Sequence, residues 1–199
     1  MKSVVRVPKQ ERSIEKKKKI IKAAYELFNS KGYYETNTAE IAKQAGVATG
    51  SVYSYFEDKN DIFYYVIDLY MDNIINRVEE LSHEIPHKNL NEIVEFYIYS
   101  FIEIHSMSKK FHNELSAQCL INSNINNYYN EKKNLILEKI LKILKDNNIS
   151  LNSIHKKEQL FIISEIVNSV CHQFIYNNAT IDKKLMITES IKDIIKIIK

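Results

Sequence analysis

The sequence predicts an all-α fold, with a small N-terminal domain and a larger helical C-terminal domain. Only three glycines and two prolines occur among 199 residues, and the hydrophobic residues, 45% of the chain, recur mostly at helical spacing. Pro8 lies in the N-terminal tail and Pro86 between two helical stretches, so neither interrupts a long apolar period. A chain of this length can bury a sizeable core.

The first long helix is predicted from about Ser13 to Ser30. Ser13 is the candidate N-cap, because a serine hydroxyl can accept a backbone N–H that the first turn leaves unpaired. Gly32 follows the last turn, where glycine commonly ends a helix. Tyr33 is expected to pack as a core aromatic of this small domain. The buried stripe of the helix should contain Ile20, Ala23, Ala24, Leu27 and Phe28.

Residues 38–59 have the pattern of two short helices joined by a tight turn. We expect helices at 38–45 and 48–55, with Thr38 as the N-cap of the first and Gly46 at its end. Val52 and Phe56, four residues apart, should face the core. The opposite face carries small and hydroxyl-bearing side chains, and a short helix of this kind can enter the DNA major groove. The pattern indicates a helix-turn-helix.

The run from Ile20 to Ile62 resembles the N-terminal domain of the TetR family of transcriptional regulators. The resemblance covers about residues 14–65 and rests on elements that agree in order and spacing: Ala23-Ala24, Leu27-Phe28, Gly32-Tyr33, Thr38, Ile41-Ala42, Ala45-Gly46-Val47, Gly50, Tyr53, Phe56 and Lys59. It implies an all-α homodimer in which a DNA-reading head precedes a body that binds an effector and the twin subunit. No comparable signature occurs beyond about residue 75.

The predicted DNA contacts follow from this arrangement. Hydroxyls can pair with several base edges, so the base-reading candidates are Thr49, Ser51, Ser54 and Tyr55, and Gly50 would let the backbone approach the duplex. The resemblance adds phosphate contacts from Thr38, Tyr53 and Lys59. For Tyr53 and Tyr55 the alternative is packing on Phe56 and Tyr33. Ala48 stands where the family often has a serine cap, and Ser54 where a larger side chain is frequent.

The charge distribution favours a nucleic acid as the partner of the head. Residues 1–60 hold 12 Lys/Arg and 7 Asp/Glu, a net of +5, whereas residues 61–199 hold 16 and 18, a net of −2. Residues 1–13 form a basic arm that either touches DNA or is only a solubilising tail. Together these features divide the chain into the arm, a DNA-binding domain at 14–60 and an effector-binding and dimerisation domain at 61–199.

The C-terminal domain is predicted to contain six helices. The first links it to the head, with Asp58 as N-cap and an end near Ser82; the others span about 90–107, 110–120, 130–145, 155–178 and 182–198, and Asn122–Asn130 forms a break. The last two helices carry more apolar surface than a chain terminus usually exposes, which favours pairing with a second copy over packing within one chain. The predicted dimer interface is Leu160, Ile163, Val167, Val170, Phe174, Leu185, Ile191, Ile194, Ile195 and Ile198.

An effector pocket in the body would be apolar with a few polar anchors. Aromatic and polar side chains within apolar helices are its candidates, although each could equally belong to ordinary core or surface. The candidates are Tyr97, Phe101, His105, Phe111, Cys119, Tyr128, His172 and Tyr176.

Several classes of function are disfavoured. The sequence has no GxSxG, phosphate-binding loop or HExxH motif, so we expect no enzyme and no cofactor. Pro86 separates His83 from His87 and disfavours a metal site there. Without a secretion signal or an apolar run of 18 residues, we expect a cytoplasmic protein that does not enter a membrane, with Cys119 and Cys171 as free thiols.

The sequence therefore predicts a ligand-responsive repressor, a homodimer released from a palindromic operator in double-stranded DNA by a small hydrophobic effector. Two alternatives stay open. One is a helical interaction module, or a non-specific DNA-binding protein, without small-molecule control; the other is an activator.

Overall fold

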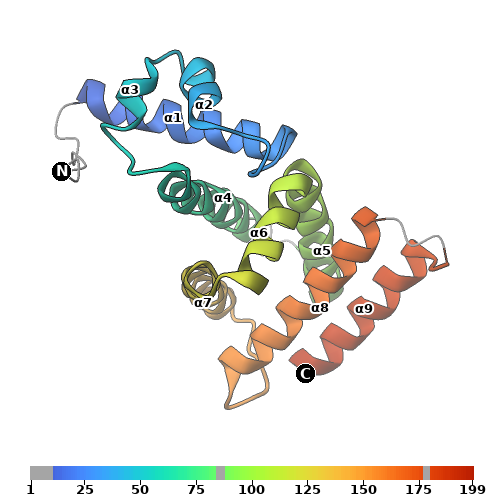
Figure 1. The fold of residues 1–199 in the computed structure, drawn as a ribbon. Helices are drawn as coiled ribbons and strands as arrows, with labels where there is room; N and C mark the ends of the chain where they lie inside the picture. Colours follow the sequence, from blue (N-terminus) through green and yellow to red (C-terminus); the bar gives the residue numbers. More distant parts are fainter. Residues whose placement is uncertain (1–10, 84–87, 177–179) are drawn as a thin grey trace. The chain divides into compact units, whose positions relative to one another are not determined.

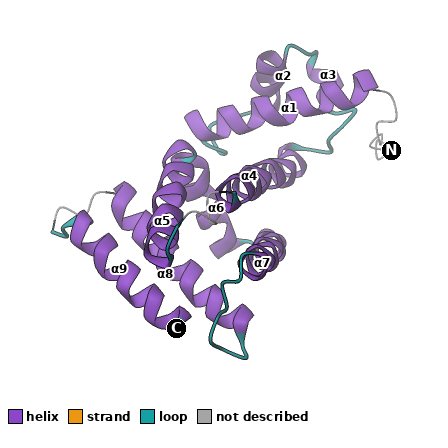
Figure 2. Cartoon of the chain, turned by 180° about the vertical axis from the view of Figure 1, so that it is seen from behind, coloured by secondary structure: helices purple, strands orange, loops and turns teal. Residues whose placement is uncertain are grey.

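The structure, a computed structural model, describes residues 11–83, 88–176 and 180–199, and these ranges contain helices and loops without a strand (Figures 1 and 2). The predicted all-α class is confirmed. The helices are α1 (Glu11–Ser30), α2 (Thr38–Ala45), α3 (Thr49–Val52), α4 (Lys59–Ser82), α5 (Leu90–Met107), α6 (Lys109–Ile121), α7 (Ser123–Asp146), α8 (Lys156–Tyr176) and α9 (Lys183–Ile198).

The described chain packs as two units whose boundary differs from the one predicted at residue 60. The first unit takes the chain up to Asp72 and adds Ser108–Tyr129, so that α6 and the start of α7 pack with the head. The second unit consists of Asn73–Met107 and Asn130–Lys199. The residues of α4 are divided between the two units, as those of a linking helix would be.

The core of the first unit forms where α1, α2, α3 and α4 bury their apolar faces. Phe63 of α4 lies at its centre, with ring centroids 5.9 Å from Phe28, 4.9 Å from Tyr33 and 5.6 Å from Phe111. Such offset aromatic contacts add to the free energy gained from burial alone. The fully buried side chains include Ile20, Ala24, Phe28, Ile41, Val52, Phe56, Ile62 and Phe63.

The start of α1 differs from the prediction, and its end agrees. Ser13 lies inside α1 and is not its cap; its hydroxyl lies 3.0 Å from the Tyr55 hydroxyl. Helical structure is already present at Glu11, so residues 11–13 do not belong to a flexible arm, and residues 1–10 of the predicted arm lie outside the described residues. The helix ends at Ser30, and Gly32 follows with φ +104°, as glycine permits.

Helix α6 is fastened to the C-terminal end of α1 and to the loop that follows it. The Glu114 carboxylate accepts the backbone N–H of Tyr33, and the side-chain Oδ1 of Asn29 accepts the backbone N–H of Phe111 at 3.4 Å. Gln118 donates to the Tyr34 hydroxyl at 2.6 Å. These bonds explain why a helix predicted to belong to the body packs with the head.

The asparagine-rich segment is helical from Ser123 onward, which corrects the break predicted over Asn122–Asn130. Asn122 precedes α7, and its side-chain oxygen accepts the backbone N–H groups of Asn124 and Ile125 at 3.1 and 3.3 Å. An N-cap of this kind begins a helix despite the low helix propensity of the asparagines that follow. Asp58 caps α4 in the same way, as predicted, by accepting the N–H of Asp61 at 2.7 Å.

The second unit is built on α8, which packs against both α5 and α9. This packing corrects part of the predicted dimer interface, because six of its ten residues are buried within their own protomer. These six are Leu160, Ile163, Val167, Val170, Ile194 and Ile198. Of the other four, Leu185 is exposed and Phe174, Ile191 and Ile195 are half-buried.

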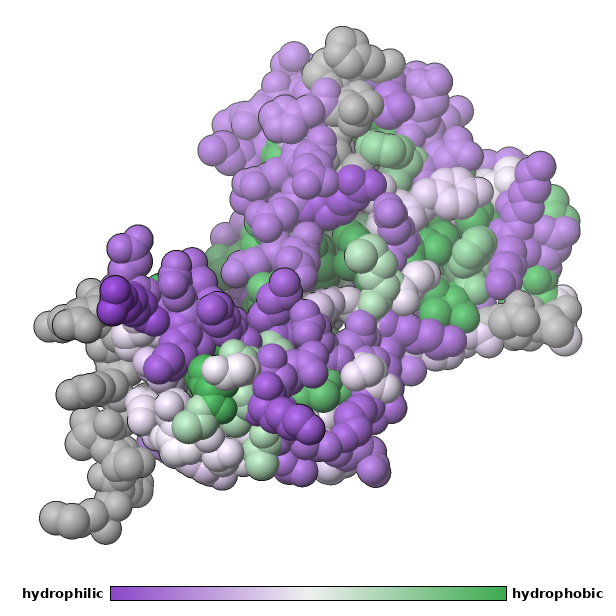
Figure 3. All heavy atoms as spheres, turned by 90° about the horizontal axis from the view of Figure 1, so that it is seen from above, coloured by the Kyte–Doolittle hydropathy of each residue, from purple (hydrophilic) through white to green (hydrophobic). Residues whose placement is uncertain are grey.

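The face in Figure 3 is largely hydrophilic, with hydrophobic side chains in separate patches.

Candidate nucleic-acid interface and effector cavity

The first helix of the helix-turn-helix is capped by Asn37, and not by Thr38 as predicted. The Asn37 side-chain oxygen accepts the N–H of Glu40 at 2.9 Å, and the Glu40 carboxylate accepts the N–H of Asn37 at 3.2 Å. This reciprocal pair is a capping box. Hydrogen bonds from Lys31 and then from the Asn37 N–H lower the pKa of Glu40, so the carboxylate is ionised where it caps the helix.

The turn and the second helix bring a short segment to the surface. Gly46 ends α2 with φ +66°, in the left-handed conformation predicted for it. Ala48 occupies the N-cap of α3 without a side-chain hydrogen bond. α3 ends at Val52 and is shorter than predicted; beyond it, the N–H of Tyr55 bonds to the Val52 carbonyl at 2.9 Å in a tight turn. Val52 and Phe56 are fully buried, as predicted.

The outward side of α3 carries hydroxyl groups. Thr49, Gly50 and Ser54 are exposed and Ser51 is half-buried. The Tyr53 side chain is 45% exposed, and its hydroxyl lies 2.8 Å from the Thr38 hydroxyl at the start of α2. The helix-turn-helix thus places these five predicted DNA contacts in α3 and the two residues after it, and Thr38 at the start of α2.

Two predicted DNA contacts have structural roles. Tyr55 is only 8% exposed and packs beside Phe56, so it corresponds to the alternative of core packing and is removed from the base-reading set. The Lys59 ammonium donates to the carbonyls of Tyr33 and Thr36 at 2.7 and 2.8 Å. Burial lowers the pKa of Lys59, while the charge of Glu114 opposes this shift. A phosphate contact by Lys59 would therefore use its one remaining donor.

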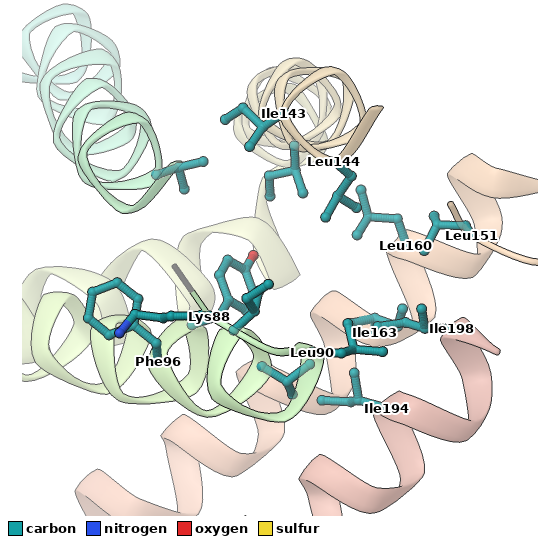
Figure 4. Close-up of a pocket in the computed structure, with 15 residues that line it drawn as sticks. Lys88, Leu90, Phe96, Ile143, Leu144, Leu151, Leu160, Ile163, Ile194 and Ile198 are labelled. Carbon is teal, nitrogen blue, oxygen red and sulfur yellow. The ribbon is translucent and has the colours of Figure 1, made fainter. Parts of the chain in front are cut away.

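The second unit contains an apolar cavity of about 90 Å³. Side chains from α5, α7, α8 and α9 point into a common space (Figure 4). Most of them are branched aliphatic residues, and Tyr97 and Lys88 are the polar members. The lining consists of Val78, Lys88, Leu90, Ile93, Val94, Phe96, Tyr97, Ile140, Ile143, Leu144, Leu151, Leu160, Ile163, Ile194 and Ile198.

Of the eight predicted ligand residues, Tyr97 alone lines this cavity. Phe111 belongs to the core of the first unit, and Tyr128 in the same unit donates to Asp68 at 2.7 Å. Cys119, half-buried, also lies in that unit. The prediction relied on aromatic and polar anchors and therefore missed the aliphatic residues that line the cavity. The sequence feature that could have indicated them is the high Ile and Leu content of α7, α8 and α9.

The remaining four candidates are not among the lining residues and belong to two ring clusters, one of which includes the lining residue Tyr97. Phe101 of α5 lies between Tyr97 and His105, with centroids at 4.6 and 5.6 Å. On α8, the rings of His172 and Tyr176 are 4.4 Å apart. Burial raises the pKa of Tyr97 and lowers that of His105, so both are neutral near pH 7. None of the four residues Phe101, His105, His172 and Tyr176 lines the cavity.

Neither a metal site nor a membrane span is found in the part of the chain that the structure describes. Among those residues, no three His, Cys, Asp or Glu side chains are arranged to hold a metal ion. No helix within the described ranges has both the length and the apolar character to cross a bilayer. His83 is exposed, and its predicted neighbour His87 lies outside the described residues.

Comparison with known proteins identifies the family that the head resembles. Residues 20–66 match the model of the bacterial regulatory proteins of the tetR family. The predicted resemblance of the head to the N-terminal domain of this family is confirmed. The HTH-type transcriptional regulator HbdR from Aromatoleum sp. is 42% identical over 89 residues, 43% of this chain and 38% of that protein. The Bacillus subtilis fatty acid metabolism regulator is 44% identical over 61 residues, 31% of each chain. These matches span less than two fifths of the relatives' length. Both relatives are described as regulatory proteins.

Solved TetR-family structures share the fold over nearly the whole chain. A Mesorhizobium loti protein assigned to the family has a TM-score of 0.74 at 18% identity, covering 94% of this chain and 98% of that one. FadR from B. subtilis, in complex with stearoyl-CoA, has a TM-score of 0.64 at 24% identity, with 92% and 99% covered. FadR from Thermus thermophilus, in complex with lauroyl-CoA, has 0.65 at 17%, with 90% and 93% covered.

Proposed function

We propose that this protein is a dimeric, ligand-responsive transcriptional repressor that binds a palindromic operator through the hydroxyl-bearing side of α3. The observation that carries the proposal is the contrast within α3. Val52 is fully buried and holds the helix in the head, while Thr49, Gly50 and Tyr53 are exposed. A helix held in this way can enter a major groove about 12 Å wide.

The charge of the head supports this DNA-binding role. The net charge of +5 over residues 1–60 favours association with a polyanion, and contacts to phosphates release counterions. The hydroxyls of Thr38 and Tyr53, 2.8 Å apart, would donate to phosphates and fix the register of α3 on the duplex. Base contacts by Thr49 and Ser51 would then supply the sequence preference.

A palindromic operator requires a dimer, and exposed apolar side chains on the last two helices support one. Phe161 of α8 is 47% exposed and Leu185 of α9 is 62% exposed, and with Ile162 they place apolar surface on both C-terminal helices. Apolar surface of this kind is typical of a protein interface. Sedimentation velocity of Phe161→Glu should show a monomer. Ile154→Glu, which changes a loop isoleucine that is 92% exposed, is the matched control and should leave the dimer intact.

The apolar cavity of the second unit supports control by a hydrophobic effector. Two solved structures that share the fold hold acyl-CoA molecules, which makes such thioesters the first ligands to test. For release from DNA, the effector must bind the state that does not bind DNA more tightly than the state that does.

The test of the function uses an operator selected from genomic fragments and fluorescence anisotropy. We expect one palindromic site to bind at least about 10³-fold more tightly than bulk DNA. Ser51→Ala and Tyr53→Phe should weaken that binding, whereas Tyr99→Phe, with the same 45% exposure as Tyr53 but on α5, should not. Equal affinity for any duplex would favour the non-specific alternative. Unchanged binding by both head variants would refute the assigned face.

A further inference from the structure

A second hollow in the second unit adjoins the apolar cavity. Unlike the cavity, this hollow has a partly polar lining. Its volume is about 530 Å³, and its polar lining comes from Lys88, Asn147, Ser150, Asn152 and Lys199. The hollow and the cavity have four lining residues in common, namely Lys88, Leu90, Ile93 and Ile198. Together they reach the roughly 300–1,000 Å³ that ligand sites occupy.

Lys88 is the charged group at the junction of the two. It is half-buried, and its ammonium lies 5.0 Å from the centroid of the Phe96 ring. Among the described residues, the acidic side chain nearest to Lys88 in sequence is Glu92, and it is engaged in a capping box: it accepts the N–H of Asn89 at 2.7 Å, and Asn89 accepts the N–H of Glu92 at 3.1 Å. Glu92 therefore caps the first turn of α5 and does not serve as the counterion of Lys88. The Lys88 ammonium is the cation that would contact a bound anion.

More positive charge flanks the polar hollow. A further hollow of about 590 Å³ has Ile149 and Ser150 in common with it and is lined by Lys142, Lys145 and Lys156. Its lining includes no acidic side chain. An anion larger than a carboxylate, such as the phosphates of a nucleotide thioester, would find additional cations here.

We propose that the site takes an amphipathic ligand, with an aliphatic chain in the cavity and an anionic head group on Lys88 in the polar hollow. This inference rests on the proposed function, because it specifies the effector of the same regulator. The branched aliphatic lining offers an alkyl chain contacts but almost no hydrogen bonds, so a polar group on the chain would lose its water without replacement. Free fatty acids and acyl-CoA thioesters both have the required chemistry.

The first experiment is calorimetric titration of the full chain, without DNA, with carboxylates of increasing chain length, their CoA thioesters and the corresponding 1-alkanols. Each methylene that enters the cavity should tighten binding about fourfold, until the cavity is filled. Carboxylates or thioesters should bind at least about tenfold more tightly than the neutral alkanols. If the thioesters bind more tightly than the carboxylates, the ligand is a CoA thioester whose phosphates contact the flanking lysines. If the carboxylates bind more tightly, the ligand is a free fatty acid. Affinity that depends on neither chain length nor head-group charge would overturn the proposal.

Two variants test the two ends of the site separately. Lys88→Met keeps an unbranched apolar chain and should weaken binding of the anionic ligands about 10- to 100-fold, with no change for the alkanols. Lys184→Met, at an exposed lysine of α9 outside both hollows, is the control. Leu144→Trp should block the chain. Should this variant fail to fold, the chain-length series on the unaltered protein carries the same test. Equal affinity of Lys88→Met and the unaltered protein for the carboxylates and thioesters would refute the role of Lys88.

DNA release is measured separately, so that the two proposals can fail independently. If the anionic ligands bind as expected but the operator complex persists, the inference about the ligand stands and the proposed regulation fails. If operator binding is specific and none of these ligands binds, the DNA-binding function stands and the inference fails.

Discussion

Gly32→Ala should destabilise the head far more than Gly46→Ala, although both glycines follow a helix and both have positive φ. Gly46 lies in the left-handed region at φ +66° with no atom within 4 Å of an added Cβ, so alanine there should cost about 1–2 kcal/mol of backbone strain. Gly32 lies at φ +104°, a region that other residues rarely enter, and the strain should cost about 1–3 kcal/mol. An added Cβ would also collide with the Glu114 carboxylate and lie 3.1 Å from the Lys110 side chain.

The collision matters because Glu114 accepts the backbone N–H of Tyr33 and so fastens α6 to the head. A hydrogen bond to a charged group contributes about 1.5–3 kcal/mol, and half-burial of Glu114 places it at the lower end of this range. The total expected for Gly32→Ala is therefore about 2.5–4.5 kcal/mol in the free energy of unfolding, measured by urea denaturation.

A double-mutant cycle separates strain from the lost bond. Once Glu114→Ala has removed the carboxylate, Gly32→Ala should cost only its backbone strain, which predicts a coupling of about 1.5 kcal/mol between the two changes. The control cycle pairs Gly46→Ala with Glu114→Ala and should be additive within about 0.5 kcal/mol. Equal costs for the two glycine variants, with both cycles additive, would refute the role given to Glu114.

Three further predictions concern caps and thiols. Asn37→Ala should cost about 1 kcal/mol in urea unfolding, because the N–H of Glu40 loses its acceptor, whereas the exposed control Asn60→Ala should change stability by no more than about 0.5 kcal/mol. Ala48→Ser should instead stabilise the head by about 0.5–1 kcal/mol, since the N-cap of α3 has no side-chain bond; a loss of stability would contradict this. Burial raises the pKa of Cys171 to about 12, so the neutral thiol stabilises the fold at neutral pH and this contribution is lost as pH rises from about 8.5 toward 12. Iodoacetamide at pH 8 should therefore alkylate the half-buried Cys119 first, as peptide mapping would show; faster labelling of Cys171 would refute its burial.

The features that sequence alone predicts correctly are those governed by local chemistry. The ends of α1 and α2 follow from Gly32 and Gly46, whose positive φ few other residues adopt. The burial of Val52 and Phe56 follows from their spacing. Helix α2 begins at Thr38 as predicted, but its N-cap is Asn37 and not Thr38; Asn37 and Glu40 stand at the spacing of a capping box, which could have identified the cap.

Features that depend on packing between distant segments could not be predicted from periodicity. Leu160 and Phe161 are neighbours on α8, yet the first is buried against its own chain and the second is 47% exposed. An apolar helix with more than one apolar face does not reveal which face a partner covers. Similarly, nothing in the sequence around Phe111 indicates that Glu114 and Asn29 fasten its helix to the head.

The most direct test of the assigned DNA-binding face is methylation protection of guanine N7 on the selected operator, because N7 lies in the major groove, where α3 is proposed to bind. The unaltered dimer should protect two groups of bases, related by symmetry and separated by one helical turn or a multiple of it. Ser51→Ala should reduce this protection selectively, at protein concentrations that saturate the DNA. Specific binding without any protection in the major groove would contradict the placement of α3.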